Sequence, residues 1–118
     1  MPALKPEVWC TSTADAPVVV LTIPGVLNRT RVFDVDVQLR VRVPAGARKT
    51  GFGLSLEIDG SRQWSRQMEA GTPGETDSLD YHCRLALAVG RESRLRARAS
   101  LGSCALLGLS LTAVEDLE

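Results

Sequence analysis

Apolar and polar residues alternate along most of this chain of 118 residues. The clearest segment is Val32–Val43, VFDVDVQLRVRV, in which every second residue is apolar and the residues between are Asp, Gln or Arg. This period of two is typical of a β-strand with one face buried and the other in water. Related segments predict further strands at Phe52–Ile58, Arg62–Met68, Leu79–Val89, Arg94–Leu101 and Cys104–Val114.

Turn residues separate these segments, and none of them shows a convincing helical period. Asp59–Gly60 is a strong hairpin signal, and Gly71 and Pro73–Gly74 mark a loop. Strands at this spacing without intervening helices predict antiparallel sheets that pack face to face. We therefore expect an all-β fold: one domain over residues 1–118, an antiparallel, jelly-roll-like β-sandwich of seven to eight strands without substantial helix.

Two segments are apolar on both faces, which is unusual for a small sandwich. They are Pro17–Gly25, with the run VVVLTI, and Cys104–Leu109. Such strands lie either in the centre of a sheet under long loops or at a subunit interface. We expect a homo-oligomer that forms through these terminal strands.

Composition excludes several classes of partner. The formal net charge is zero, so no overall field attracts nucleic acid or an anionic membrane, and neither is expected as a partner. The first residues do not have the pattern of a signal peptide, and no apolar run is long enough to span a membrane. Three cysteines, Cys10, Cys83 and Cys104, cannot all pair within one chain. The expectation is a cytoplasmic protein with free thiols, with a Cys10–Cys104 bridge as the alternative.

The stretch Thr76–Val89 contains the only histidine and the only tyrosine, beside a cysteine. In one strand, Cys83 belongs to the apolar row and His82 projects to the opposite face, so the two cannot act as nucleophile and base. Cys83 is predicted to be a core residue with a raised pKa. One histidine supplies one ligand, and no metal or other cofactor is expected.

Asp34 and Asp36 are paired carboxylates on the polar face of the long strand. They could serve a small hydrolase, alone or with His82, because glycoside hydrolysis uses two carboxyl groups. Neighbours on one strand more often face water opposite a cross-strand arginine. We therefore expect that the protein is not an enzyme.

The register of the hairpin at Asp59–Gly60 decides where Trp64 points. A two-residue type I′ turn places Trp64 opposite Ser55 on the outer face and pairs Arg62 with Glu57. A type I turn with a glycine bulge places Trp64 opposite Leu54 on the apolar face. Both registers leave polar residues on both faces of the return strand, which is typical of an edge strand.

Arginine dominates the basic residues, and it suits bidentate contacts with carboxylate, phosphate or sulfate. An exposed tryptophan flanked by arginine can stack on a sugar ring and donate hydrogen bonds to it. The predicted binding surface consists of Trp64, Arg62 and Arg66, with Arg40 and Arg42 if their strand lies close. Arg94, Arg96 and Arg98 would join Arg40 and Arg42 if those strands were neighbours. The interpretation is a non-catalytic module for a glycan or anionic group, and an assembly subunit is the alternative.

Overall fold

The computed structural model describes residues 5–46 and 49–117, and these ranges contain eight strands and no helix. The strands are β1 (Val8–Thr13), β2 (Val18–Ile23), β3 (Arg31–Arg42), β4 (Gly51–Ile58), β5 (Ser61–Glu69), β6 (Thr76–Leu87), β7 (Ser93–Ser100) and β8 (Ala105–Glu115). The described residues accordingly include no helix long and apolar enough to cross a membrane.

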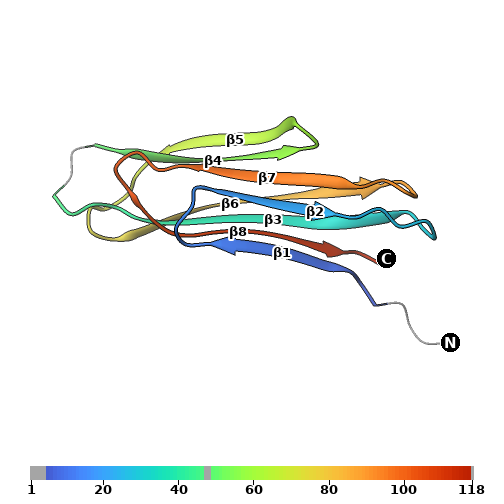
Figure 1. Ribbon diagram of the computed structural model, residues 1–118. Helices are drawn as coiled ribbons and strands as arrows, with labels where there is room; N and C mark the ends of the chain where they lie inside the picture. The colour runs from blue at the N-terminus through green and yellow to red at the C-terminus, as the bar shows by residue number, and fades with distance from the viewer. Residues whose placement is uncertain (1–4, 47–48, 118) are drawn as a thin grey trace.

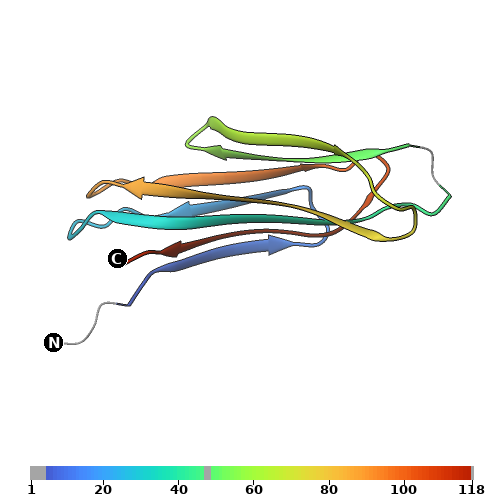
Figure 2. The same cartoon turned by 180° about the vertical axis from the view of Figure 1, so that it is seen from behind.

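The strands form two antiparallel sheets that pack face to face (Figures 1 and 2). Sheet A has the order β1-β8-β3-β6, and sheet B has the order β2-β7-β4-β5. All neighbouring strands are antiparallel. Successive strands often cross between the sheets, as in a jelly roll, which closes eight strands into two interlocking Greek keys. The predicted all-β sandwich is confirmed.

The core lies between the sheets and follows the alternation of the sequence. In β3 every second residue from Phe33 to Val41 is buried, because its side chain points toward sheet B. The facing residues of sheet B are equally buried; Phe52, Leu54, Leu56, Leu95 and Ala97 are the main ones. Polar residues of β3 such as Gln38 and Arg40 lie on the outer face. The period of two therefore records which side of each strand meets the other sheet.

The two segments that are apolar on both faces have different positions. β8 lies in the centre of sheet A between β1 and β3, whereas β2 is an edge strand of sheet B. The alternation of apolar and polar residues did not predict β1, which is the edge strand of sheet A beside β8. The first and second strands thus form one side of the sandwich, and β5 and β6 form the other (Figure 1).

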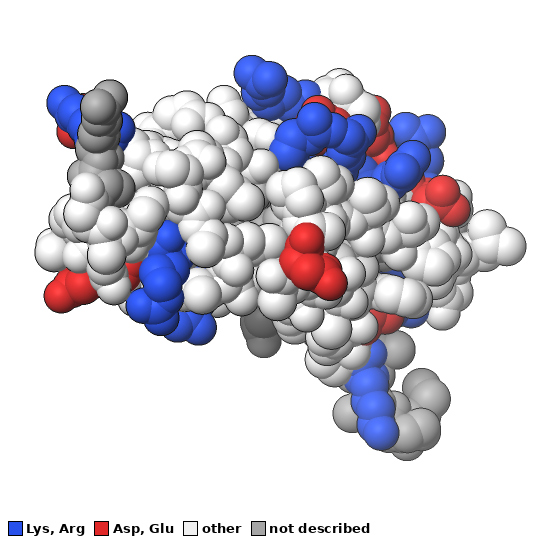
Figure 3. All heavy atoms as spheres, turned by 60° about the vertical axis from the view of Figure 1, so that its left-hand side comes forward, with Lys and Arg blue, Asp and Glu red and all other residues white. Residues whose placement is uncertain are grey.

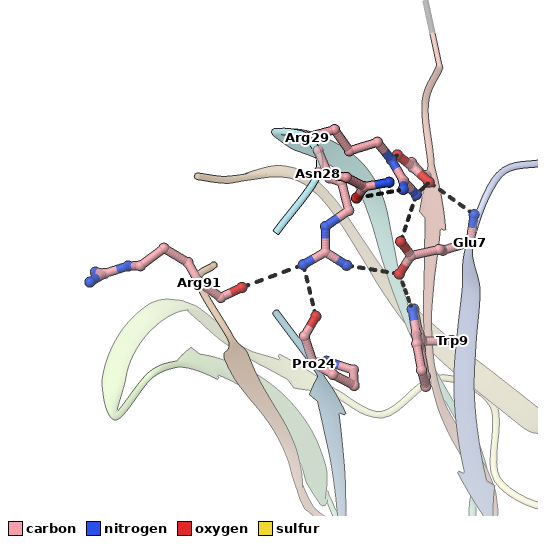
Figure 4. A network of polar contacts seen from close by, with 8 residues as sticks. Glu7, Trp9, Pro24, Asn28, Arg29 and Arg91 are labelled. Carbon is pink, nitrogen blue, oxygen red and sulfur yellow. Dashed lines mark hydrogen bonds and ion pairs between the residues drawn. The ribbon is translucent and has the colours of Figure 1, made fainter. Parts of the chain in front are cut away.

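Four charged side chains form an ionic network at one end of the sandwich, where the two ends of the described chain meet (Figure 4). Arg29 donates to both carboxylate oxygens of Glu115, at 2.9 and 3.1 Å, and to Glu7 at 2.7 Å. Arg31 donates to Glu7 at 2.8 Å, and Trp9 donates to the same carboxylate at 3.0 Å. Two cations and two anions therefore neutralise one another in a region that is largely closed to water.

The side chains of Arg31 and Glu115 are almost fully buried, at 0% and 2% exposure. Arg31 also donates to the carbonyl oxygen of Pro24 at 2.8 Å and lies over the ring of Phe33. Hydrogen bonds from Arg29 lower the pKa of Glu115, against the opposing effect of burial. The network joins the first strand, the β2–β3 loop and the last strand, so it holds the terminal strands in place.

Candidate functional site

The β4–β5 hairpin decides the position of Trp64 through both a turn and a bulge. Asp59 and Gly60 have φ angles of 52° and 84°, as a type I′ turn requires at both central residues. Arg62 accordingly pairs with Glu57, in agreement with the first predicted register. The register then shifts, because Trp64 pairs with Leu56 and Gln63 is left as an extra residue. This bulge turns Trp64 to the apolar side.

Trp64 closes the side of the sandwich between β5 and β6. Its ring stacks on Tyr81, with centroids 4.3 Å apart and planes inclined by 9°. Both rings are half-buried and pack against the core. One face of the indole is thus already covered by an aromatic partner within the chain, and the pair shields the core from water.

The five residues of the predicted binding surface lie on three different surfaces. Arg62 lies on the outer face of sheet B, beside Glu57. Arg66 is exposed and pairs with Leu54, so it follows the same row of β5 as Trp64. Arg40 and Arg42 are exposed on β3 in sheet A. The structure does not gather these residues, because β3 and β5 belong to different sheets.

Arg94, Arg96 and Arg98 also lie apart from Arg40 and Arg42, because β7 belongs to sheet B. Their row is bordered by β2 on one side and β4 on the other. Arg98 pairs with Ser55, and Arg96 pairs with Glu57, whose other neighbour is Arg62. The outer face of sheet B therefore carries four arginines, with Glu57 between Arg96 and Arg62 and Glu69 farther along β5. Figure 3 shows Lys and Arg gathered in the upper part of the molecule, with Asp and Glu among them.

A hollow of about 320 Å³ lies on this arginine-bearing face. The residues that line it are Gly53, Leu54, Ser55, Arg62, Ser65, Gln67, Arg98 and Ser100. In this part of the hairpin Ser55 pairs with Ser65, and Gly53 pairs with Gln67. The small residues Gly53, Ser55 and Ser65 form the floor of the hollow. The Gln67 side chain lies across Gly53, in space that a side chain at position 53 would need. Longer side chains, Arg62 and Arg98, stand at its margin. We name this hollow the arginine pocket.

The two guanidinium groups at the arginine pocket are not engaged elsewhere. Neither Arg62 nor Arg98 forms an ion pair or a side-chain hydrogen bond with any other residue in ranges 5–46 and 49–117. Next to them, the Nε atom of Arg96 is buried without a hydrogen-bond partner. Serine hydroxyls and the Gln67 amide complete a set that is rich in donors. Such a set can hold a carboxylate, sulfate or phosphate.

The other chemical candidates have partners within the chain. Arg84 binds Asp34 at 3.0 Å, which is the cross-strand pairing expected for that carboxylate. His82 lies 2.9 Å from Asp36, and its side chain is 54% exposed. Within the described part of the chain, no three His, Cys, Asp or Glu side chains gather as metal ligands. Arg40 lines a separate hollow of about 420 Å³ on the outer face of sheet A.

The cysteines do not form a reactive centre. All three are free; Cys10 is exposed, Cys83 is half-buried and Cys104 is buried. Burial raises the pKa of both Cys83 and Cys104, so their thiols stay protonated at neutral pH. The position of Cys83 on the apolar row and its raised pKa agree with the prediction.

Comparisons with known proteins identify the fold only. No protein-family model and no curated protein matches the chain. Among solved structures, dimeric latent PorU from Porphyromonas gingivalis is similar, with a TM-score of 0.52 and 17% identity over 96% of this chain. The T13 IBDV viral particle gives a TM-score of 0.44 and 15% identity over 94% of this chain. The chain spans 13% of the PorU chain and 35% of the viral chain. The class that these observations define is an eight-stranded β-sandwich module.

Proposed function

We propose that this β-sandwich is a non-catalytic binding module whose arginine pocket takes the anionic group of a sulfated or uronic glycan. The observation that supports the proposal is the pair Arg62 and Arg98, which flank a polar hollow without an acidic partner of their own. Charge-assisted hydrogen bonds from guanidinium are among the stronger polar contacts in water, and their geometry matches planar or tetrahedral oxyanions.

The surroundings of the pocket fit an elongated ligand better than a single ion. The arginine row continues along β7 to Arg96 and Arg94, which line a second, smaller hollow of about 80 Å³ together with Glu57 and Gly60. A chain with repeated anionic groups could contact both hollows. Because the contacts are ionic and Trp64 is stacked on Tyr81, affinity should depend on charge more than on aromatic stacking.

The arrangement also suits an accessory module. In PorU a region of this fold makes up only a small part of a long chain. An accessory domain of this kind would bind a ligand on behalf of a larger protein and would not catalyse a reaction itself.

The residues of the hydrolase alternative are Asp34, Asp36 and His82. His82 contacts both aspartates, and Asp34 also pairs with Arg84, all on an exposed strand face.

Titration by NMR tests the proposal, with inorganic sulfate and a sulfated oligosaccharide as probes. We expect amide shifts to cluster at Ser55, Ser65 and Arg98. Arg62→Gln and Arg98→Gln should each weaken binding by about tenfold or more, since a hydrogen bond to a charged group contributes about 1.5–3 kcal/mol. Arg40→Gln, on the other sheet, is the matched control. The proposal fails if no amide at the pocket shifts, or if Arg40→Gln weakens binding as much.

A further inference from the structure

The two sides of the sandwich differ in how they protect their edge strands. An edge strand exposes unpaired backbone groups, and native proteins commonly protect it with charged side chains or proline. β5 and β6 carry such charges; Arg62, Arg66 and Glu69 lie on one, and Asp77, Asp80, His82 and Arg84 lie on the other. β1 and β2, VWCTST and VVVLTI, contain no charged residue and no proline. Only one side of the sandwich thus lacks electrostatic protection.

Apolar side chains are exposed on this unprotected side. Val8 on β1 is 59% exposed, and Val20 on β2 is 39% exposed. Val114 on β8, which pairs with Val8, is 36% exposed and extends the apolar surface onto the outer face of sheet A. Scattered exposed valines are ordinary, but here they coincide with open strand edges.

The hydrogen-bonding pattern shows which backbone groups of β1 are open. The amide of Glu115 donates to the carbonyl of Glu7 at 2.8 Å, so odd-numbered residues of this strand bond to β8. The amides and carbonyls of Val8, Cys10 and Ser12 therefore point toward the free edge. A partner strand in antiparallel orientation can pair with all three of these residues.

The charges at the ends of β1 favour a second copy of the same strand as that partner. Lys5 precedes the strand and Asp15 follows it. If two copies pair antiparallel with Cys10 opposite Cys10, Val8 lies opposite Ser12 and Lys5 is level with Asp15 of the other copy. The unlike charges attract at both ends, and the uncharged centre contains no group that repels its counterpart. The zero net charge of the chain removes long-range repulsion as well.

We propose that β1 is a dimerisation edge, which pairs antiparallel with β1 of a second copy about a two-fold axis at Cys10 and extends sheet A across both copies. β2 lies beside β1 on the same side, so its uncharged edge approaches the corresponding edge of the other copy without a charge conflict. Glu7 is engaged with Arg29 and Arg31 inside its own chain and does not disturb the pairing.

Sedimentation velocity over a concentration series tests the proposal. The wild-type chain should shift from monomer to dimer as concentration rises. Cys10→Lys places a charge at the two-fold axis, where it meets its own copy, and should give a monomer at every concentration with an unchanged melting temperature. The matched control is Ser78→Lys, an exposed position on β6, which should dimerise like the wild type. A wild-type monomer at every concentration, or a dimer that survives Cys10→Lys, overturns the proposal.

Cross-linking then identifies the register. Paired residues in an antiparallel sheet have Cα atoms about 5.5 Å apart, which lies in the range that a disulfide spans. Copper-phenanthroline should therefore convert the wild type into a covalent dimer through Cys10, and Cys10→Ser should abolish the cross-link. Asp15→Lys should weaken dimerisation by about two- to fivefold, and Lys5→Asp in the same chain should restore it. A dimer that gives no cross-link, or a double variant that stays weak, contradicts this register.

Discussion

Replacing Arg31 with methionine removes a fully buried guanidinium, whose carbon Cζ lies 5.4 Å from the centre of the Phe33 ring, and leaves an apolar side chain in its place. The main lost contacts are the hydrogen bonds to the Glu7 carboxylate and the Pro24 carbonyl, both 2.8 Å long, and a longer bond of 3.4 Å to the carbonyl oxygen of Arg91 is lost with them. At about 1.5–3 kcal/mol for each of the two short bonds, the loss amounts to about 3–6 kcal/mol. Part of this loss is offset. In the wild type the Nε atom of Arg31 is buried without a hydrogen-bond partner, which costs about 1–3 kcal/mol, and the variant avoids this cost.

Glu7 keeps Arg29 and Trp9 as donors in this variant, so its charge is not left unpaired. We therefore expect Arg31→Met to lower the free energy of unfolding by about 2–3 kcal/mol, a substantial share of the stability of a small domain. Urea unfolding followed by circular dichroism measures the change. Lys49→Met is the control, because its ion pair with Glu69 is 79% and 73% exposed and should contribute nothing measurable. An unchanged or increased stability of Arg31→Met would refute the reasoning.

Two further predictions concern pH and the bulge. Because Arg29 lowers the pKa of Glu115, the stabilisation from this carboxylate is present above the unfolded pKa of about 4.3 and is lost as the pH falls through the lower folded value. In urea unfolding from about pH 7 to pH 3, the stability difference between wild type and Glu115→Gln should shrink toward acid, and a constant difference would contradict this. Deletion of Gln63 removes the extra residue of the bulge, so Arg62 and Trp64 follow one another opposite Glu57 and Leu56, and Trp64 should stay on the apolar side. Its emission should keep its wavelength because the ring stays stacked on Tyr81, whereas a shift of the emission to the red would contradict this register.

The sequence predicts the fold class well because the period of two is a direct record of burial. β3 shows this most clearly, since its alternate residues are buried against sheet B and the others face water. The turn at Asp59–Gly60 is equally predictable, because both residues must adopt positive φ angles. The bulge at Gln63 is not predictable from the sequence, because both faces of β5 are polar and either register exposes similar residues to water. The position of Trp64 thus depends on one residue that has no local signal.

The ionic network has a sequence signal that is easily missed. Arg31 is in phase with the apolar row of Phe33 and Val35, and Glu115 is in phase with Leu111 and Ala113. A charged residue in phase with a buried row predicts burial, and a buried charge needs a partner. The partner itself cannot be read from the sequence, since Arg29 and Glu115 are 86 positions apart and meet only through strand order. The same limit applies to the arginine rows, which strand order assigns to opposite sheets.

The arginine pocket and the dimerisation edge have a joint consequence. The two-fold axis of antiparallel strands in one sheet is perpendicular to that sheet, so the outer faces of sheet B in both copies point the same way. Two arginine pockets would then meet one polyanionic chain together, and the second contact becomes intramolecular. Cys10→Lys should therefore leave the affinity for inorganic sulfate unchanged and weaken binding of a long sulfated glycan by about tenfold or more. Equal affinities of this variant and the wild type for the long glycan would show that the two pockets do not act on one chain.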